Sequence, residues 1–265
     1  MSGGVIDTSK ILEVTKLKVV FGDGAEQVAS LRNVSFAIQA NSFTIIYGPS
    51  GSGKSTLLNV MGGLLSPTEG SVDVQGQDIY RLSRDELAHF RANRIGFVHQ
   101  TNYWVKSLNV VDNLAIPLYA LGYGMSKANR LAMNALDRVN MADFAKKNPA
   151  VLSGGEQQRI AMARALVNEP LIIIADEPTG NLDTVNGDNL MKLLLNCQTE
   201  FRRTIILVTH NMEYIPFAEH LLHIHDGLVE DIGADQMATV TNGLLEKTRQ
   251  RIGELEKIKR EAVRE

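Results

Sequence analysis

The chain has 265 residues, of which 44% are hydrophobic and 22% charged, as is ordinary for a globular protein with a sizeable core. Its formal net charge of −3 gives no reason to expect a nucleic-acid partner, because nucleic-acid binding favours a strongly basic face. The one cysteine, Cys197, excludes an internal disulfide framework, and its apolar helical surroundings predict a buried thiol.

No stretch of the chain is expected to enter or cross a membrane. The first thirty residues mix charge and glycine and lack the apolar run of a secretory signal. The longest apolar runs, such as residues 171–175, fall far short of the roughly 18 residues that span a bilayer. If the protein acts at a membrane, another chain is expected to supply the spanning part.

The N-terminal third predicts strands followed by a strand, loop and helix. Residues 12–21 and 28–38 are β-rich and are separated by the turn signal Gly22-Asp-Gly24. Residues 43–47 form a short apolar run of the buried-strand type, a glycine-rich turn follows, and residues 55–62 predict a helix. Further strands are expected at 71–74 and 94–98.

The composition changes at about residue 101 and changes back at about 167. Helical periodicity at 111–121, 127–139 and 153–167 predicts a helical subdomain inserted into an α/β core. The alternation of strand and helix then resumes, as is typical of an α/β fold. It comprises predicted strands at 171–175, 204–208 and 221–225 and a helix at 186–201.

Residues 48–55 fit the pattern G-x-x-x-x-G-K-[S/T], which binds phosphates. Its glycines let the backbone turn so that successive N–H groups point inward, and the following helix adds its positive end. Lys54 would reach the β- and γ-phosphates and Ser55 would bind Mg²⁺. The predicted order of strand, loop and helix is the context that this loop requires.

Two acidic residues follow the apolar strand 171–175. Asp176, at the tip of a strand parallel to the first, is well placed to hold Mg²⁺. Glu177 lies one residue closer to the γ-phosphate and could orient the attacking water as general base. Two acids after a strand are often only a solvated strand end, so this reading depends on the phosphate loop upstream.

The segment Leu-Ser-Gly-Gly-Glu-Gln-Gln-Arg at 152–159 predicts an unusual helix start. Ser153 and Glu156 form an S-x-x-E capping box, which explains both residues. It does not explain Gly154 and Gly155, each of which costs a helix roughly 1 kcal/mol. This cost suggests close approach to a ligand at a helix end that can bind anions.

Taken together, these three motifs resemble the nucleotide-binding domain of ATP-binding cassette (ABC) proteins. The resemblance covers about residues 11–233 and leaves 234–265 as a C-terminal helical extension. It implies a P-loop NTPase core with an N-terminal antiparallel β subdomain and the inserted helical subdomain. It also implies ATP hydrolysis with ATP and Mg²⁺ as cofactors.

The same resemblance implies further site residues. Gln100 matches the glutamine that touches Mg²⁺ or the lytic water, and His210 matches the histidine that contacts the γ-phosphate. Asp183 matches the loop that crosses to a second subunit, and Phe21 matches the aromatic that stacks on adenine, where most relatives have tyrosine. The residues implied to bind nucleotide are then Phe21, Gly48, Pro49, Ser50, Gly51, Ser52, Gly53, Lys54, Ser55, Thr56, Ser153, Gly154, Gly155 and Asp183.

In this family two copies pack head to tail, so Ser153, Gly154 and Gly155 would act on the partner's nucleotide. The sequences of residues 62–70, 113–118 and 176–183 resemble those of the macrolide-exporter, lipoprotein-release and cell-division ATPases. That group implies a homodimer on the cytoplasmic face of the membrane, paired with a transmembrane permease. A signalling or mechanotransmission complex that moves no cargo is the alternative.

Other ABC classes fit less well. A DNA-repair ATPase would carry a long coiled-coil insertion between the two nucleotide motifs, a translation factor would carry two cassettes, and some importers carry a large regulatory domain. After Gln100, residues Asn102, Tyr103, Trp104 and Leu108 are expected to meet the membrane partner, unless Trp104 is simply core. Residues 244–265 predict an amphipathic helix that either packs on its own domain or contacts a partner.

Overall fold

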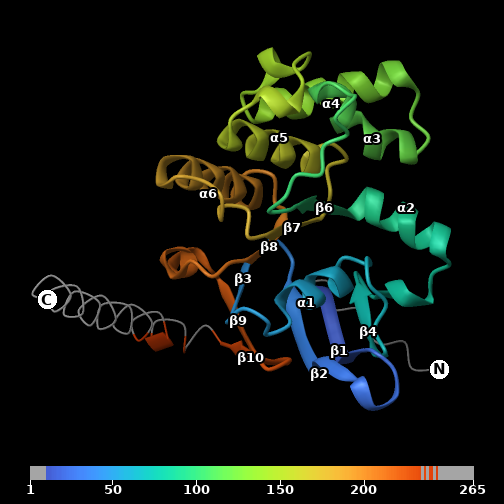
Figure 1. Cartoon of the computed structure of the whole chain (residues 1–265), viewed down its shortest axis with the longest axis vertical. Helices are drawn as coiled ribbons and strands as arrows, with labels where there is room; N and C mark the ends of the chain where they lie inside the picture. The colour runs from blue at the N-terminus through green and yellow to red at the C-terminus, as the bar shows by residue number, and fades with distance from the viewer. Residues whose placement is uncertain (1–9, 234–235, 237–238, 241–242, 244–265) are drawn as a thin grey trace, which may run out of the picture.

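A computed structural model describes residues 10–233 together with 236, 239–240 and 243. A six-stranded sheet lies at its centre in the order β10-β9-β3-β8-β7-β6, and Figure 1 shows it running through the middle of the molecule. All neighbouring pairs are parallel except β9 and β10, which are antiparallel. Its strands are β3 (Phe43–Tyr47), β6 (Ile95–Val98), β7 (Ile172–Asp176), β8 (Thr204–Val208), β9 (His220–His225) and β10 (Leu228–Ile232).

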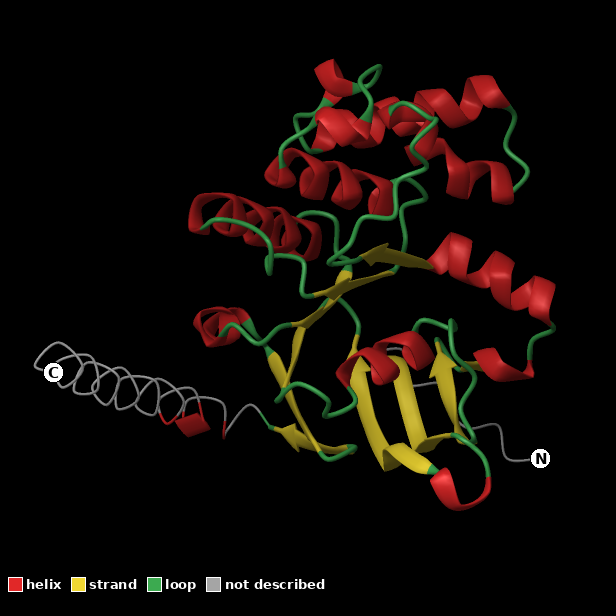
Figure 2. Ribbon diagram, in the orientation of Figure 1, coloured by secondary structure: helices red, strands yellow, loops and turns green. Residues whose placement is uncertain are grey.

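A second, antiparallel sheet is built from the N-terminal part of the chain. Its order is β2-β1-β4-β5, and Figure 2 shows it beside the central sheet. Its strands are β1 (Lys10–Phe21), β2 (Val28–Gln39), β4 (Glu69–Val74) and β5 (Gln77–Asp78). The antiparallel β layer expected from the sequence is therefore present.

Helix α1 (Lys54–Met61) lies between the two sheets. Its buried face carries Leu57, Leu58 and Met61, which join one apolar cluster with both sheets. Burial of such side chains is the main favourable term in folding. Packing against both sheets fixes the position of α1 and keeps its N-terminus at the end of β3.

On the other side of the central sheet, α5 and α6 pack against its strands, and α3 and α4 pack on α5 within a second apolar cluster. Figure 1 shows α3, α4 and α5 stacked together, with α6 beside them. These helices are α3 (Val110–Ala120), α4 (Met125–Arg138), α5 (Gly154–Leu166) and α6 (Thr184–Thr199). The chain between β6 and β7 is therefore helical, as its periodicity predicts.

Several elements differ from the predicted ones. Strands β3 and β8 have the predicted bounds, and the other predicted elements differ by one or two residues at their ends. Helix α2 (Arg84–Arg94), the short strand β5 and strand β10 were not predicted. Short 3-10 turns complete the chain: η1 (Gly24–Glu26), η2 (Ile79–Arg81), η3 (Ala142–Phe144), η4 (Pro149–Val151) and η5 (Met212–Phe217).

Three further predictions concern single features. Cys197 is buried, and burial raises the pKa of its thiol to about 12, as expected of an inert core cysteine. Among the described residues, no helix has both the length and the apolar character to span a bilayer. The helix predicted at 244–265 lies outside the described residues.

Candidate functional site

The loop between β3 and α1 can be built only with glycine at two positions. Gly53 has φ 106°, and a Cβ there would lie 2.7 Å from the carbonyl oxygen of Ser30. A Cβ on Gly48 would collide with the carbonyl oxygen of Ile224 on β9. The loop is thus pressed against β2 and β9 with no room for side chains, and this fixes its path.

The helix that follows the loop begins without a side-chain cap. Gly53 occupies the cap position, and the first helical hydrogen bond runs from Leu57 to Gly53 over 2.9 Å. Lys54 is buried, and its Nζ donates to the carbonyl oxygens of Gly48 at 2.9 Å and Pro49 at 2.7 Å. The Ser52 hydroxyl is also buried and has no described partner. The amides at the uncapped helix start, a cation and a hydroxyl without a described partner are suited to bind a polyphosphate.

Asp176 and Ser55 come together at the end of β7. Burial, followed by the nearby Glu177 charge, raises the pKa of Asp176, while the Lys54 ammonium and then the Ser55 hydroxyl oppose that rise. A half-buried carboxylate beside a hydroxyl suits a hard divalent cation such as Mg²⁺. Among the described residues no cluster of three His, Cys, Asp or Glu could hold a metal, so hydroxyl and amide oxygens would complete the ligand set.

Glu177 and His210 form a direct pair. Strands β7 and β8 are neighbours with Asp176 opposite Val208, so the residues that follow both strands meet at one edge. His210 Nδ1 lies 3.0 Å from Glu177 Oε2. Glu177 has a left-handed backbone, with φ 44°, and its amide donates to Val208 over 3.0 Å. Such a conformation persists only where the surrounding structure holds it, so the direction of the Glu177 side chain is fixed by the turn.

Gln100 lies beside the Glu177 turn. Its Nε2 is 3.1 Å from the position of a Cβ on Gly180, and the Gly180 amide donates to the Glu177 carbonyl over 3.1 Å. The structure therefore brings Gln100, Glu177 and His210 to one edge of the central sheet. This is the edge from which the phosphate loop leaves β3, because β3, β8 and β7 are parallel neighbours.

Phe21 ends β1 and is 45% exposed. It pairs with Val28, two residues before Ser30, whose hydroxyl donates to Thr56 over 2.9 Å. An exposed aromatic ring therefore stands on the strand pair that touches the start of α1. Such a ring offers a flat apolar face for a nucleobase.

The start of α5 has the predicted capping box. The Ser153 amide and hydroxyl both donate to Glu156 Oε2 at 2.8 Å, and the Glu156 amide donates to the Ser153 hydroxyl at 3.4 Å. The two hydrogen bonds from Ser153 lower the pKa of the Glu156 carboxyl. Within the described part of the chain, Ser153 makes no hydrogen bond to the loop 48–53.

The two glycines after Ser153 differ in their surroundings. A Cβ on Gly155 would lie 2.5 Å from Asn186 Oδ1 on α6, so a neighbour within the chain already explains this glycine. This gives Gly155 a reason within the chain in addition to the ligand approach that the sequence suggested for both glycines. Gly154 is exposed, and a Cβ there would make only ordinary contacts, with Leu182 at 3.8 Å and the Asn181 carbonyl oxygen at 3.9 Å. Its surface is therefore open to another molecule.

Asp183 starts α6 and is engaged within its own chain. Its two carboxylate oxygens accept hydrogen bonds from the backbone amide of Asn186 at 2.8 Å and from the Asn186 side chain at 2.9 Å. The backbone bond first, then the side-chain bond, lowers the pKa of Asp183. In this structure Asp183 is an N-cap rather than a free group.

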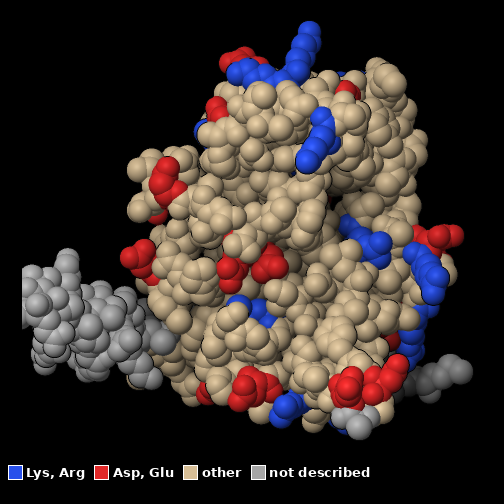
Figure 3. Space-filling model, viewed as in Figure 1, with Lys and Arg blue, Asp and Glu red and all other residues tan. Residues whose placement is uncertain are grey.

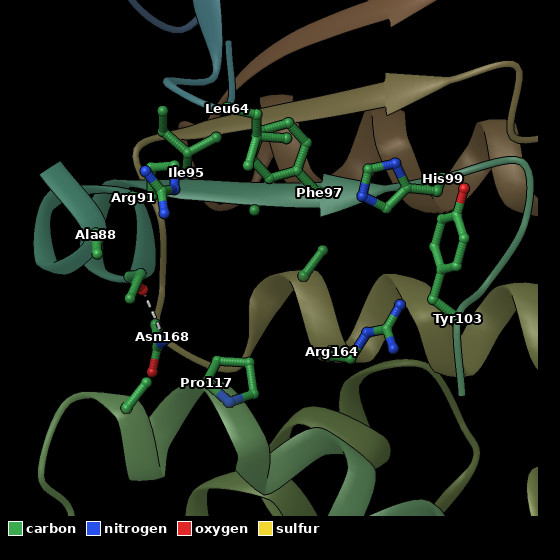
Figure 4. Close-up of a pocket in the computed structure, with 14 residues that line it drawn as sticks. Leu64, Ala88, Arg91, Ile95, Phe97, His99, Tyr103, Pro117, Arg164 and Asn168 are labelled. Carbon is green, nitrogen blue, oxygen red and sulfur yellow. Dashed lines mark hydrogen bonds between the residues drawn. The ribbon is translucent and has the colours of Figure 1, made fainter. Parts of the chain in front are cut away.

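A groove of about 470 Å³ lies at the junction of α2, β6, α3 and α5 (Figure 4). Most of its wall is apolar, from residues such as Leu64, Ile95 and Pro117. Its charged lining residues are Arg91 and Arg164, and none of its described lining residues is acidic. Figure 3 shows basic side chains over α2 on this side of the molecule.

Sequence reasoning found only part of this groove. Tyr103 lines it and is 70% exposed, as expected for a docking residue. Trp104 instead packs against the core cluster, which agrees with the alternative reading of this residue. The α2 wall was missed, although its Ser83 and Glu86 form the same capping box as Ser153 and Glu156.

Comparison with known proteins places these features in a family. A family model described as ABC transporter matches residues 31–180. The lipoprotein-releasing system ATP-binding protein LolD of Pseudoalteromonas translucida is 37% identical over 217 residues, which cover 82% of this chain and 94% of that protein. The macrolide export ATP-binding/permease protein MacB of Aggregatibacter actinomycetemcomitans is 38% identical over 82% of this chain, but only 34% of its own length is matched.

Solved structures give the same result. A dimeric post-hydrolysis state of the ATP-binding cassette MJ0796, bound to ADP and Pi, superposes with a TM-score of 0.77 at 36% identity. The match covers 84% of this chain and 98% of that one. The α/β P-loop NTPase fold predicted from the sequence is therefore confirmed.

Proposed function

The chain belongs to the ABC transporter family, and from that premise we propose that it is the ATPase subunit of a membrane complex whose spanning part is a separate chain. Like its relatives it is an ATPase that uses ATP with Mg²⁺. The observation that carries the proposal is the gathering of the Lys54 loop, the Asp176–Ser55 pair and the Glu177–His210 pair at one sheet edge.

Each of these groups has a role that its surroundings support. The amides at the start of α1 and the Lys54 ammonium would bind the β- and γ-phosphates. Asp176 and Ser55, with Gln100, would hold Mg²⁺, which neutralises charge on the phosphate oxygens when bound. Glu177 would take the proton of the attacking water, and His210 would orient the carboxylate that it contacts. Phe21 would stack on the adenine.

Half of the site would come from a second copy of the chain. Gly154 is exposed at the N-terminus of α5, and Ser153 makes no described contact with the loop 48–53 of its own chain. The similar cassette MJ0796 is dimeric in its ADP-bound structure. We therefore assign Ser153 and Gly154 to the nucleotide of the partner subunit, where their amides and hydroxyl would meet developing charge.

Mixing two inactive variants tests this assignment. Lys54→Met removes the cation that would bind the phosphates. Ser153→Arg blocks residues 152–155 at the start of α5, called the signature turn below, so each homodimer should be inactive. In an equal mixture half of the dimers are mixed, and each mixed dimer keeps one intact site, so hydrolysis should return to about a quarter of the wild-type rate. A mixture as inactive as its components would refute a shared site.

The groove in Figure 4 would receive the membrane partner. Its apolar wall suits a short apolar segment, and the two guanidinium groups without an acidic neighbour among its described lining residues favour an acidic side chain on that segment. We infer that the chain sits at the cytoplasmic face of the membrane and serves a complex of the lipoprotein-release or macrolide-export kind. LolD and MacB are the relatives that suggest this group.

A photo-crosslinking side chain tests the groove directly. Placed at Tyr103, it should capture an integral membrane protein in native membranes. The matched control is the same side chain at Phe217, which is exposed to 43% but does not line the groove. Equal capture from both positions, or capture of soluble proteins alone, would contradict the proposed docking site.

A further inference from the structure

The chain's one tryptophan, Trp104, points away from the groove and into α5. Its neighbour Tyr103 lines the groove, whereas the Trp104 indole N–H donates to Gln157 Oε1 over 2.9 Å. Gln157 lies one turn inside α5, four residues after Ser153. Apolar packing alone would not require this hydrogen bond, which fixes the orientation of the indole relative to α5.

The side-chain amide of Gln157 connects Trp104 to the signature turn. Its Nε2 donates to the carbonyl oxygen of Leu152 over 2.9 Å. Leu152 directly precedes Ser153, whose amide and hydroxyl bind Glu156. Both ends of the Gln157 side chain are therefore engaged, one on Trp104 and one on the residue that leads into the turn.

The ring face of Trp104 reaches the groove through Arg164. The Arg164 guanidinium lies over the indole, 4.5 Å from its centroid, and donates to the carbonyl oxygen of Asn102 over 2.7 Å. Arg164 also lines the groove, as Figure 4 shows. Burial lowers the pKa of Arg164 to about 10, and its described partners are the indole and that carbonyl rather than a carboxylate.

These contacts form a continuous path from the groove wall to the signature turn. It runs from Arg164 to Trp104, then to Gln157 and the carbonyl of Leu152. A second bond, from Gln158 Nε2 to the carbonyl of His99 over 3.2 Å, joins α5 to the residue before Gln100. The loop after β6 is therefore fastened to α5 at several points, and both the Asn102 carbonyl and the Trp104 ring contact the groove cation Arg164.

We propose that Trp104 is a positioning residue that makes the orientation of the signature turn depend on what the groove holds. The proposal rests on the proposed function, because it assumes that Ser153 and Gly154 act on the nucleotide of a second copy. A partner segment that attracts the Arg164 guanidinium would weaken its contact with the Trp104 ring. The position of the ring determines that of the Gln157 side chain, which is bonded to the carbonyl of Leu152.

Trp104→Phe keeps an aromatic ring beneath Arg164, removes the N–H donor and replaces the indole by a smaller ring. The variant should hydrolyse ATP with a kcat about five- to tenfold lower, since one part-buried bond is lost, while KM stays within about twofold. The matched control is Tyr119→Phe, which removes the exposed hydroxyl bond to Asn129 and should leave kcat unchanged. A wild-type kcat in Trp104→Phe, or a kcat loss matched by weaker binding of ATP, would overturn the proposal.

A double-mutant cycle separates this role from plain packing. Gln157→Leu breaks the same bond from the other side and also removes the bond to the Leu152 carbonyl, so adding Trp104→Phe should lower kcat no further than Gln157→Leu alone. Independent, multiplying losses would show that the two residues act separately and would overturn the proposal. If Ser153→Arg turns over normally the proposed function fails, whereas normal turnover in Trp104→Phe alone defeats only the role of Trp104.

Tryptophan fluorescence gives a readout that needs no change at Trp104. ATP should shift the emission of the Glu177→Gln chain, in which the closed dimer accumulates. It should not shift the emission of Ser153→Arg, which binds nucleotide without closing. An unchanged emission in both chains, or an equal shift in both, would contradict a response of Trp104 to the engaged signature turn.

Discussion

Gly155 offers a test of whether a signature glycine serves the fold or the nucleotide. In Gly155→Ala the new Cβ would lie 2.5 Å from Asn186 Oδ1 and 2.6 Å from its Cγ, which is too close for either atom to stay in place. Overpacking of this kind costs about 1–3 kcal/mol. Alanine returns up to about 1 kcal/mol of helix propensity. The net change expected is a loss of about 0–2 kcal/mol in the free energy of unfolding, measured by urea denaturation.

Asn186→Ala supplies the matched second change. It removes the obstacle and the side-chain bond to Asp183 at 2.9 Å, but keeps the backbone bond from Asn186 to Asp183 at 2.8 Å. The exposed bond is worth about 1 kcal/mol at most. The double variant should therefore unfold at a higher urea concentration than Gly155→Ala, with a coupling energy of about 1–3 kcal/mol.

The two measurements separate the two explanations of Gly155. If the glycine serves Asn186 alone, the double variant regains both stability and hydrolysis. If the nucleotide of the partner subunit also approaches Gly155, stability returns while phosphate release stays low. No rescue by Asn186→Ala, with a coupling energy near zero between the two changes, would refute the close approach of Gly155 to Asn186.

Two further changes probe the acidic pair after β7. Glu177→Gln keeps the shape of the side chain and removes its basicity, so it should bind ATP but release phosphate at least about a hundredfold more slowly, and near-normal turnover would exclude a general base. Because the folded-state pKa of Asp176 is raised, the native state holds that proton more tightly, and the resulting stability is lost as the pH rises through this pKa. Asp176→Asn should therefore melt above the wild type at neutral pH without Mg²⁺, with the difference shrinking in acid, and a lower melting temperature at neutral pH would contradict this.

The phosphate loop was predictable because its constraints are local. Glycines, a lysine and a hydroxyl in fixed spacing after an apolar run identify the loop from eight consecutive residues, although its packing against β2 and β9 is seen only in the structure. The pairing of Glu177 with His210 was not predictable from spacing, because it depends on β7 and β8 being neighbours in the sheet. The family resemblance supplied that position, and the structure supplies the 3.0 Å contact.

Helix α2 was missed for a different reason. Its residues are mostly polar and none of them is fully buried, so its apolar stripe, which includes Leu87 and Phe90 packed partly against the core, is too thin to produce a clear periodicity. Its start does carry a signal, since Ser83 and Glu86 form a capping box with two bonds shorter than 3 Å. The rule used for Ser153 would have found it. Without α2 one wall of the groove was missing from the sequence-based account.

Three of the groups that we propose to act on the nucleotide are bonded within the chain. Lys54 donates to loop carbonyls, Glu177 is paired with His210, and Ser153 with Glu156. A buried group left without a partner costs roughly 1–3 kcal/mol, so the two bonds of the buried Lys54 stabilise the loop. We expect ATP and a second copy to replace these bonds with others, so that the net gain from each exchange is small. The proposed closed dimer should therefore reopen once the γ-phosphate is cleaved.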